Sequence, residues 1–340
     1  MSEPTKFYLF KRTNGYYYIL YLQDGRKRWK STGADKKAEA LKALSSFRDL
    51  IKKRPQSIPF SRFMQDFLSF ARTNYAPATV EIYDRALTRL IDLIPGASVN
   101  ALTPQHLDRF KSLRVGEVSP VSVNIELRSL RSAMNVAVRW KLIEANPFSR
   151  LQQVRVAETQ PAYLTKEDFQ KLINLVKEAW LKEVIVFAAL TGMRRGEILN
   201  LRWDAIDLQR KVIRVESHPD FKTKLGRRRV VPMSDVVHSL LASKWPQSVT
   251  EYVFTLRDRP IMEDWVSRRF KHYVYQAKLK DARLHFHSLR HTFASWLVQD
   301  GVSLYEVQKL LGHASISVTQ VYSHLRPDQL HETVNRITLN

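Results

Sequence analysis

Five short segments in the second half of the chain combine arginine, lysine, histidine or tyrosine with glycine and apolar residues. In chain order they are Thr191-Gly192-Met193-Arg194-Arg195, Lys222-Thr223-Lys224-Leu225-Gly226, His287-Ser288-Leu289-Arg290-His291, Leu311-Gly312-His313 and the single residue Tyr322. Arginine carries a permanent charge on a planar fork that donates paired hydrogen bonds to phosphate oxygens. Together with histidine it is typical of a phosphate-binding site.

His287 and Arg290 are three residues apart in a segment expected to be helical, so their side chains share one face. A metal site is an alternative, through His285 and His287 or through the four-residue spacing of His287 and His291. Ser288 stands where a zinc protease needs glutamate, which argues against that alternative. Satisfied structural histidines are the third interpretation of this segment.

The residues before His313 predict how it is positioned. Ser303 and Glu306 form a capping box, which predicts a helix over 304–311. Gly312 is placed to end that helix in the left-handed conformation. His313 would then follow at a defined turn.

Tyr322 is expected on a further helix that begins at Ser315 or Ser317. Taken alone, such a tyrosine is typical of a half-buried core residue. The motifs that precede it change this interpretation.

As a set, the motifs resemble those of the tyrosine recombinases, also called the phage integrase family. They are T-G-x-R, a lysine eight residues before the proline of V-V-P, H-x-L-R-H, L-G-H and H-x8-Y. The six matching positions are Arg194, Lys224, His287, Arg290, His313 and Tyr322. The resemblance is close from about residue 160 to 335 and looser over the helical region before it. It implies an enzyme that cuts and rejoins DNA.

Two of these positions have a neighbour of the same residue type. The family pattern T-G-x-R selects Arg194 as the first catalytic arginine and leaves Arg195 as a DNA or surface contact. Counting back eight residues from Pro232 selects Lys224 over Lys222.

The resemblance implies a role for each residue. Arg194 and Arg290 would neutralise the charge that grows on the non-bridging phosphate oxygens, and His313 would donate a further hydrogen bond to them. Tyr322 would attack phosphorus, giving a 3'-phosphotyrosyl enzyme and a free 5'-hydroxyl. His287 is the candidate base, and Lys224 is the candidate acid for the departing 5'-oxygen.

The partners and cofactors follow from the same resemblance. No ATP is needed, because the covalent link keeps the energy of the broken bond, and neither a cofactor nor a metal is expected. Recombination would require double-stranded DNA, four protomers on two synapsed sites and a Holliday junction. Accessory DNA-bending or directionality proteins are further expected partners.

The fold class expected is multidomain and mainly α with small β-sheets. The segments are an arm-DNA-binding-like sheet plus helix over 1–56, a helical, SAM-like core DNA-binding domain over 57–150, a linker over 151–162 and a mixed α+β catalytic domain over 163–340. The apolar residues of the last segment, 325–340, would pack either on a neighbouring subunit or on their own domain.

The first region shows hairpin signals at Asn14-Gly15 and Asp24-Gly25, which separate three expected strands. The strands are expected over 7–11, 16–22 and 28–31, with a helix over 36–53. Candidates for a DNA-binding face of this sheet are Tyr16, Tyr18, Arg26, Arg28 and Lys30. A solvated basic surface is the alternative.

The helical region is expected to contain helices over 60–72, 78–94, 104–113 and 120–140. Thr103 and Ser119 each precede a proline, so they are predicted N-caps of the last two. Arg128, Arg131 and Arg139 lie off the apolar stripe of the fourth helix and are available to phosphate or to solvent. After the linker, a helix opens at Thr165, and strands are expected over 212–215 and 229–232.

The composition favours a polyanion as the partner. The 340 residues include 55 Lys and Arg against 33 acids, a formal net charge of +22. Residues 1–56 alone hold 14 Lys or Arg against 5 acids. Nucleic acid is the leading candidate, although ribosome association or peripheral membrane binding would fit the same charge.

Several other classes of protein are excluded. The chain has no cysteine, which excludes disulfides, zinc fingers and thiol nucleophiles. It contains neither G-x-G-x-x-G nor a P-loop motif, so the usual nucleotide sites are not expected. No apolar run of about 18 residues and no secretory signal can be recognised, so we expect a cytoplasmic protein.

Two alternatives to a recombinase remain at this point. A type IB topoisomerase shares the nucleophile and the arginines, but the arm-like first region favours recombination. A non-catalytic DNA-binding regulator explains the charge, but it does not explain six filled catalytic positions.

Overall fold

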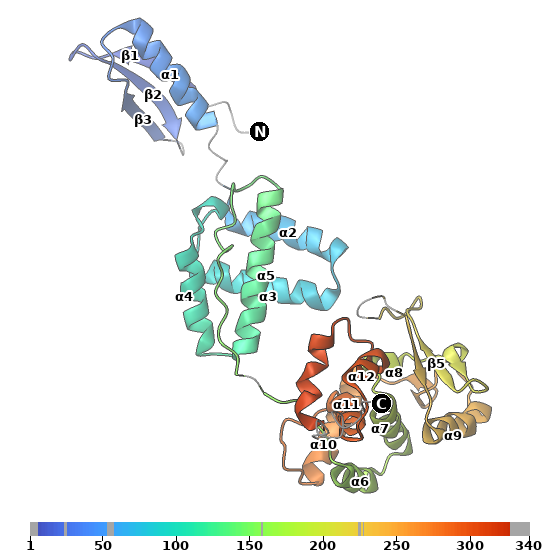
Figure 1. Ribbon diagram of the computed structural model, residues 1–340. Helices are drawn as coiled ribbons and strands as arrows, with labels where there is room; N and C mark the ends of the chain where they lie inside the picture. Colours follow the sequence, from blue (N-terminus) through green and yellow to red (C-terminus); the bar gives the residue numbers. More distant parts are fainter. Residues whose placement is uncertain are drawn as a thin grey trace, which may run out of the picture. The chain divides into compact units, whose positions relative to one another are not determined.

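The computed structural model describes residues 6–23, 26–52, 58–157, 159–223, 226 and 228–326. The chain divides into two compact units, Met1–Ala157 and Glu158–Asn340 (Figure 1). Each unit has its own hydrophobic core. In the described residues helices predominate, and the strands form small antiparallel sheets. The predicted multidomain, mainly α fold class is therefore confirmed.

The first unit opens with a three-stranded antiparallel sheet of order β1-β2-β3 and one helix. These elements are β1 (Phe7–Lys11), β2 (Tyr17–Gln23), β3 (Arg26–Ser31) and α1 (Lys37–Lys52). The predicted strands and helix are confirmed. Gly15, at φ +84°, lies in the first predicted turn, whereas the second, Asp24-Gly25, lies outside the described residues.

One face of this sheet is covered by α1. Ile19 is 1% exposed, and Phe47 of α1 packs edge-on against Tyr21 with ring centroids 5.0 Å apart. Arg28 lies opposite Tyr21 in the strand register. Lys30 lies opposite Ile19, and its Nζ is 4.7 Å from the centre of the Phe47 ring. Since alternate residues of a strand share a face, Arg28 and Lys30 lie on the helix side.

The other face of the sheet is open and aromatic. The Arg12 guanidinium stacks over the rings of Tyr18 and Trp29, at 4.5 and 4.7 Å from their centroids. Trp29 is 46% exposed. The sequence prediction grouped Tyr18 with Arg28 and Lys30, and this grouping is wrong because the pleat puts the basic pair on the opposite face.

The rest of the first unit is helical. Its elements are α2 (Phe60–Asn74), α3 (Pro77–Leu93), the 3-10 turn η1 (Val99–Ala101), α4 (Pro104–Val115) and α5 (Pro120–Arg139). As predicted, α4 and α5 begin with proline, and Ser119 Oγ accepts a hydrogen bond from the Ser122 N–H. Arg128, Arg131 and Arg139 are exposed on α5, as its apolar stripe predicts.

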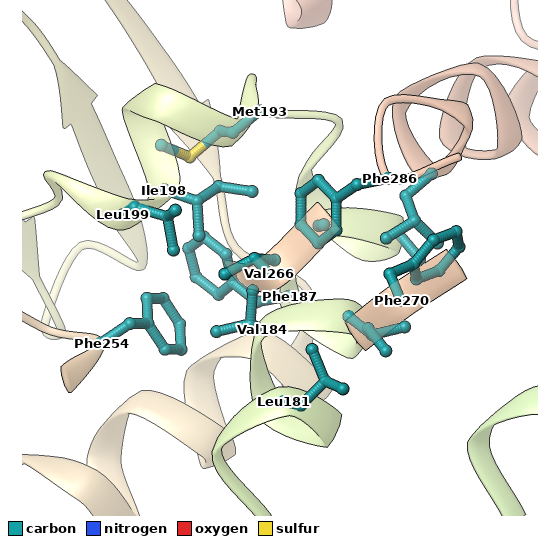
Figure 2. Packing of buried hydrophobic residues seen from close by; sticks show 14 of the residues in the cluster. Leu181, Val184, Phe187, Met193, Ile198, Leu199, Phe254, Val266, Phe270 and Phe286 are labelled. Carbon is teal, nitrogen blue, oxygen red and sulfur yellow. The ribbon is translucent and has the colours of Figure 1, made fainter. Parts of the chain in front are cut away.

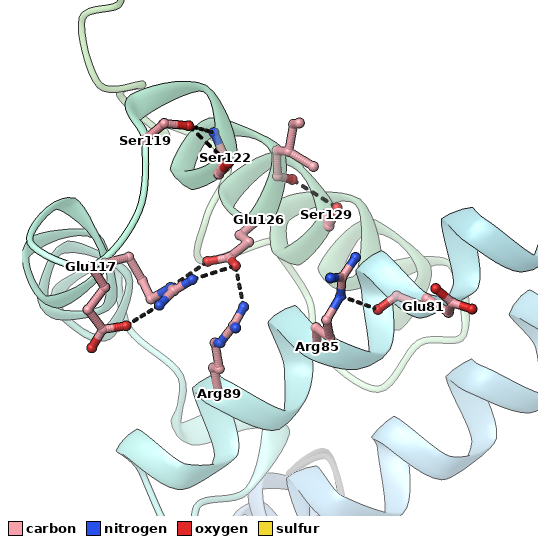
Figure 3. A network of polar contacts seen from close by, with 10 residues as sticks. Glu81, Arg85, Arg89, Glu117, Ser119, Ser122, Glu126 and Ser129 are labelled. Carbon is pink, nitrogen blue, oxygen red and sulfur yellow. Dashed lines mark hydrogen bonds and ion pairs between the residues drawn. The ribbon is translucent and has the colours of Figure 1, made fainter. Parts of the chain in front are cut away.

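An ion-pair network with a buried centre joins three of these helices (Figure 3). Arg114 of α4 donates two hydrogen bonds, of 2.7 and 2.9 Å, to the carboxylate of Glu126 on α5. Arg89 of α3 pairs with the same carboxylate, and Glu117 pairs with Arg114. Arg114 and Glu126 are 6% and 8% exposed, so loss of either partner would leave a buried charge.

The segment predicted as a linker, 151–162, begins with residues that belong to the helical core. Leu151 and Val154 pack against that core. The Asn124 side chain exchanges two hydrogen bonds of 2.8 Å with the backbone of Val154. The boundary between the two compact units falls within this segment, while the exact domain limits stay predictions.

The second unit combines helices with a sheet of order β4-β5-β6 and a two-stranded β7-β8 pair. Its helices are α6 (Lys166–Leu175), α7 (Ala179–Thr191), α8 (Arg195–Leu199), α9 (Asp235–Lys244), α10 (Glu263–Gln276), α11 (Ser288–Gln299) and α12 (Leu304–Leu311). Its strands and 3-10 turns are η2 (Trp203–Ala205), β4 (Ile206–Asp207), β5 (Val212–Val215), β6 (Arg229–Pro232), η3 (Trp245–Gln247), β7 (Thr255–Leu256), β8 (Arg259–Pro260), η4 (Ile316–Val318) and η5 (Gln320–Leu325). Within the described parts of the chain, no helix is both long and apolar enough to cross a membrane.

Helix α7 is the apolar centre of this unit. Leu181, Val184 and Phe187 are fully buried on it, and Val266 and Phe270 of α10 belong to the same core (Figure 2). A helix held this firmly fixes the position of its C-terminal end. The segment that contains Arg194, the first of the five segments of the sequence analysis, lies at this end of α7.

Candidate active site

Arg194 is positioned by the end of α7 and the start of α8. Gly192 ends α7 at φ +61°, and a Cβ there would lie 2.4 Å from the Phe293 ring, so only glycine fits. The Arg194 N–H donates to Glu197 Oε2 at 2.8 Å, and its Nη1 donates to Oε1 at 2.9 Å. Arg194 is thereby fixed at both its backbone and its side chain.

The Glu197 carboxylate also holds a second arginine. Arg229, at the start of β6, donates from Nη1 and Nη2 to its two oxygens at 2.9 and 2.6 Å. The Glu197 side chain is only 2% exposed. Burial opposes its ionisation, but the hydrogen bonds and charges of Arg229 and Arg194 outweigh burial and lower the pKa of Glu197 to about 2.

Arg290 lies on α11 and is 3% exposed. Its Nη1 donates to the Gly192 carbonyl and its Nη2 to the Leu311 carbonyl, both at 2.6 Å. Burial and the charges of Arg194 and Arg229 lower the pKa of Arg290. Glu197 pairs with Arg194 and Arg229, and no carboxylate among the described residues pairs with Arg290, so the cluster has an excess of positive charge that favours an anion.

His313 follows α12, which the capping box of Ser303 and Glu306 starts as predicted. Gly312 ends the helix at φ +67°, which is also as predicted. His313 Nδ1 is 2.9 Å from Thr319 Oγ1. Burial, followed by the charges of nearby arginines, lowers the pKa of His313 to about 4, so the ring is neutral at neutral pH. In the tautomer with its proton on Nε2, the neutral ring accepts from Thr319 Oγ1 at Nδ1 and can donate from Nε2.

Tyr322 lies on the 3-10 turn η5, whose N-cap is Thr319. The helix predicted to start at Ser315 is a separate turn, η4, which Ser315 caps and which ends before Tyr322. This prediction is therefore wrong in length, because two short turns replace one helix. Tyr322 is 2% exposed, and burial raises its pKa to about 12.

The hydroxyl of Tyr322 has a partner that the sequence interpretation did not assign. Its Oη lies 2.6 Å from Nδ1 of His291. His287, the predicted base, is exposed at the N-cap of α11, with its ring centroid 5.3 Å from that of His291. In the described parts of the chain, no three histidine or acidic side chains are arranged to hold a metal ion.

Two predicted or competing residues lie elsewhere. Lys224 is outside the described residues, so its role stays a prediction. Arg195 points to α10, where its Nε and Nη2 donate to Glu263 Oε2 at 3.0 and 2.5 Å. Arg195 therefore does not join the cluster around Glu197.

The structure thus brings together Arg194, Arg290, His313 and Tyr322 and adds three polar residues around them. The added residues are Glu197, Arg229 and His291. Glu197 could have been inferred from its spacing three residues after Arg194, and His291 from its place in H-x-L-R-H. Arg229 carried no comparable signal, because its neighbour Arg228 is of the same type.

A hollow of about 230 Å³ opens beside the cluster. It is lined by Arg194, Glu197, Thr223, Arg228, Arg229, Lys309, Gly312 and His313. Four of these eight residues carry a positive charge and one a negative charge, so the hollow suits a phosphate group.

Comparison with known proteins places these features in a family. The sequence profile of the phage integrase family matches residues 162–329. The integrase of Salmonella phage P22 is 32% identical over 222 residues, which are 62% of this chain but only 56% of that protein. The tyrosine recombinase of Thermosipho africanus is 28% identical over 283 residues, 80% of this chain and 97% of that protein.

Solved structures share the fold. A lambda integrase tetramer bound to a Holliday junction matches with a TM-score of 0.67 at 20% identity. The match covers 94% of this chain and 95% of that chain. With its family profile, its relatives and its fold in agreement, the chain belongs to the phage integrase family, the tyrosine recombinases.

Proposed function

We propose that this protein is a site-specific recombinase, or integrase, that cuts and rejoins DNA through a 3'-phosphotyrosyl intermediate. One observation carries the proposal: Arg194 and His313 line a positively charged hollow, and the buried Arg290 lies close to both of them and to the buried Tyr322. The family assignment supports the same reaction.

The proposed chemistry begins with the phosphate. A phosphodiester resists nucleophiles because its two non-bridging oxygens share a negative charge, which grows in the transition state. Arg194 and Arg290 neutralise that charge without reorganising, since Glu197 and two backbone carbonyls already hold them. His313 donates a further hydrogen bond from Nε2.

Tyr322 then attacks phosphorus in line, and the 5'-oxygen leaves with a proton from Lys224. The resemblance assigns the base to His287. Because the phosphotyrosine preserves the energy of the broken bond, a 5'-hydroxyl of a second strand reverses the step. No cofactor enters this scheme.

The proposed partner is double-stranded DNA. We propose that the protein acts on this DNA in the cytoplasm. A lambda integrase with this fold forms a tetramer on a Holliday junction. We extend that assembly to four copies of this chain on two synapsed sites. The sheet and helix of residues 1–56 would bind separate arm DNA, and accessory DNA-bending or directionality proteins would assist, as would be expected of a mobile genetic element.

Strand exchange between two duplexes tests the proposal. Sites selected from random DNA by binding to the full-length protein, one of them labelled, are incubated with the protein and EDTA but without ATP. We expect labelled strands joined to the unlabelled duplex. Relaxation of supercoiled plasmid without any exchange would instead indicate a topoisomerase, and binding without either reaction would indicate a regulator.

A further inference from the structure

His291 shares a hydrogen bond with the hydroxyl of the proposed nucleophile, Tyr322. Its Nδ1 lies 2.6 Å from Tyr322 Oη, a short hydrogen bond for this pair of atoms. His291 directly follows Arg290 on α11, so the helix that positions a phosphate-binding arginine also positions this imidazole. In the described residues, no hydrogen bond joins His287 to Tyr322.

The environment keeps His291 in the form that accepts a proton. Burial, followed by the charges of His285 and Arg290, lowers the pKa of His291 to about 4. At neutral pH the ring is therefore uncharged, and only one of its nitrogens carries hydrogen. In the tautomer with the ring proton on Nε2, the Tyr322 hydroxyl donates and Nδ1 accepts, so Nδ1 is the atom placed to take the hydroxyl proton.

We infer that His291, and not His287, is the base that takes the hydroxyl proton of Tyr322 when the phosphotyrosyl bond forms. The inference rests on the proposed function and adds to it a catalytic residue outside the six expected from the family motifs.

The step balances. As Tyr322 Oη bonds to phosphorus, its O–H bond breaks and an N–H bond forms at His291 Nδ1. The bond between phosphorus and the 5'-oxygen breaks, and that oxygen takes a proton from the acid proposed at Lys224. The negative phosphate offsets the charge of Arg290, so the imidazolium that forms is less costly than in the empty site. In the rejoining step His291 returns the proton to Tyr322.

The test compares the rate of covalent adduct formation on a nicked, binding-selected duplex. In His291→Asn, the amide oxygen replaces Nδ1 and can accept the hydrogen bond, but it cannot take the proton. We expect its rate at pH 7.5 to fall about 100-fold or more, the loss usual for a general base. DNA affinity should be unchanged.

The pH profile separates chemistry from positioning. The groups facing His291 are His285, His287, Arg290 and Tyr322. With the base removed, hydroxide must take the proton, so the rate of His291→Asn should rise about tenfold per pH unit from 6 to 9, whereas the wild-type rate stays nearly flat. A flat profile in the variant would overturn the inference, since a structural role predicts it.

Two matched variants complete the design. His272→Asn alters an exposed histidine of α10 and should keep the wild-type rate, and His287→Asn should lose far less than His291→Asn. If His291→Asn stays within about threefold of wild type while His287→Asn loses the rate, the base is His287 and the inference is wrong.

A measurement without DNA keeps the inference testable on its own. Ring ¹⁵N chemical shifts of His291 in the free protein should show an unprotonated Nδ1, and a proton on Nδ1 would contradict the inference. If wild-type protein forms no adduct at all, the proposed function fails, whereas an adduct that survives His291→Asn at full rate contradicts only the inference.

Discussion

At the scale of single residues, the carboxylate of Glu197 organises two of the three arginines at the site. It is almost fully buried and accepts hydrogen bonds from Arg194 and from Arg229. A buried carboxylate is stable only when it is paired, so each of the three side chains holds the others in place. The active-site geometry and the stability of this unit therefore depend on the same group.

This coupling makes Glu197→Gln informative. The pKa of Glu197 falls from 4.5 to about 2 on folding, which corresponds to about 3 kcal/mol of stability. A depressed pKa stabilises the fold above the unfolded value, so this contribution is complete above about pH 5 and is lost as the pH falls towards 2. Chemical unfolding should show a less stable variant at pH 7 and a smaller difference at pH 3.

The matched control is Glu263→Gln. Glu263 pairs with Arg195, but its side chain is 47% exposed, so its loss should cost less than about 1 kcal/mol. Equal losses of stability in the two variants would contradict the role given to Glu197. The Glu197 variant alone should also form the DNA adduct more slowly, because Arg194 loses its anchor.

The proposed acid is tested by chemical rescue. Lys224→Ala should cleave ordinary DNA slowly, and it should recover most of its rate on DNA with a 5'-bridging sulfur, because a thiolate leaves without a proton. Lys222→Ala is the control and should be close to wild type on both substrates. If Lys224→Ala is equally slow on both, the acid is another residue.

At the scale of elements, two helix ends carry the site. Helix α7 ends at Gly192 directly before Arg194, and α12 ends at Gly312 directly before His313. Both glycines have positive φ. Each also packs closely, since a Cβ on Gly312 would lie 2.6 Å from Arg229 Cδ. The glycines of the T-G-x-R and L-G-H motifs thus shape the backbone and leave room for a neighbour.

Gly312→Ala and Gly301→Ala separate these two effects. Gly301 also has positive φ, at +84°, but nothing lies within 4 Å of a Cβ built there. Gly301→Ala should therefore cost only backbone strain, about 1–2 kcal/mol. Gly312→Ala should cost more and should slow adduct formation, because it displaces Arg229 from Glu197. Equal unfolding free energies and equal rates would contradict this account.

The elements of this fold were largely predictable, because their signals are local. Proline at the first turns of α4 and α5 and the capping box of α12 give the starts of those helices directly. The element that carries Tyr322 was harder to predict. Two short 3-10 turns contain too few residues for a helical pattern of apolar residues to be recognised. The faces of the first sheet were misassigned because Tyr18 and Lys30 lie on different strands, and only their pairing register relates them.

The site residues that stand in a sequence motif were predictable. The residues that meet only in the tertiary fold were not. Arg229, at the start of β6, meets Glu197 of α8 across 32 positions of sequence. His291 stands in a recognisable motif, but its contact with Tyr322 depends on how η5 folds back onto α11. Pairings at this range are set by tertiary packing, which periodicity does not encode.

At the scale of the whole molecule, the basic residues are spread over both compact units. Separate parts of the chain should therefore each contribute to DNA binding. Each unit has its own hydrophobic core. The first sheet adds an open aromatic face with a stacked arginine. This face would contact DNA independently of the catalytic hollow.

A shortened protein that begins at Pro59 tests whether the first sheet and its helix bind DNA separately. It should still form the covalent adduct on a short core site, because the helical core and the catalytic unit are intact. On long DNA with distant arm sites it should bind more weakly. The slope of log affinity against log salt should become shallower by about 0.9 for each phosphate that the shortened protein no longer neutralises. Unchanged long-site binding, or failure to cleave the short site, would contradict an arm-binding role.

The central claim is that Tyr322 forms the covalent bond to DNA. The most direct measurement is mass spectrometry of the denatured adduct after digestion with trypsin and nuclease. Trypsin leaves a peptide spanning 310–336, because Arg326 precedes proline, and Tyr322 is its only tyrosine. We predict that this peptide carries the 3'-phosphonucleotide, and that Tyr322→Phe binds the same DNA and forms no adduct. A nucleotide on any other peptide, or an adduct that persists in Tyr322→Phe, would contradict the account.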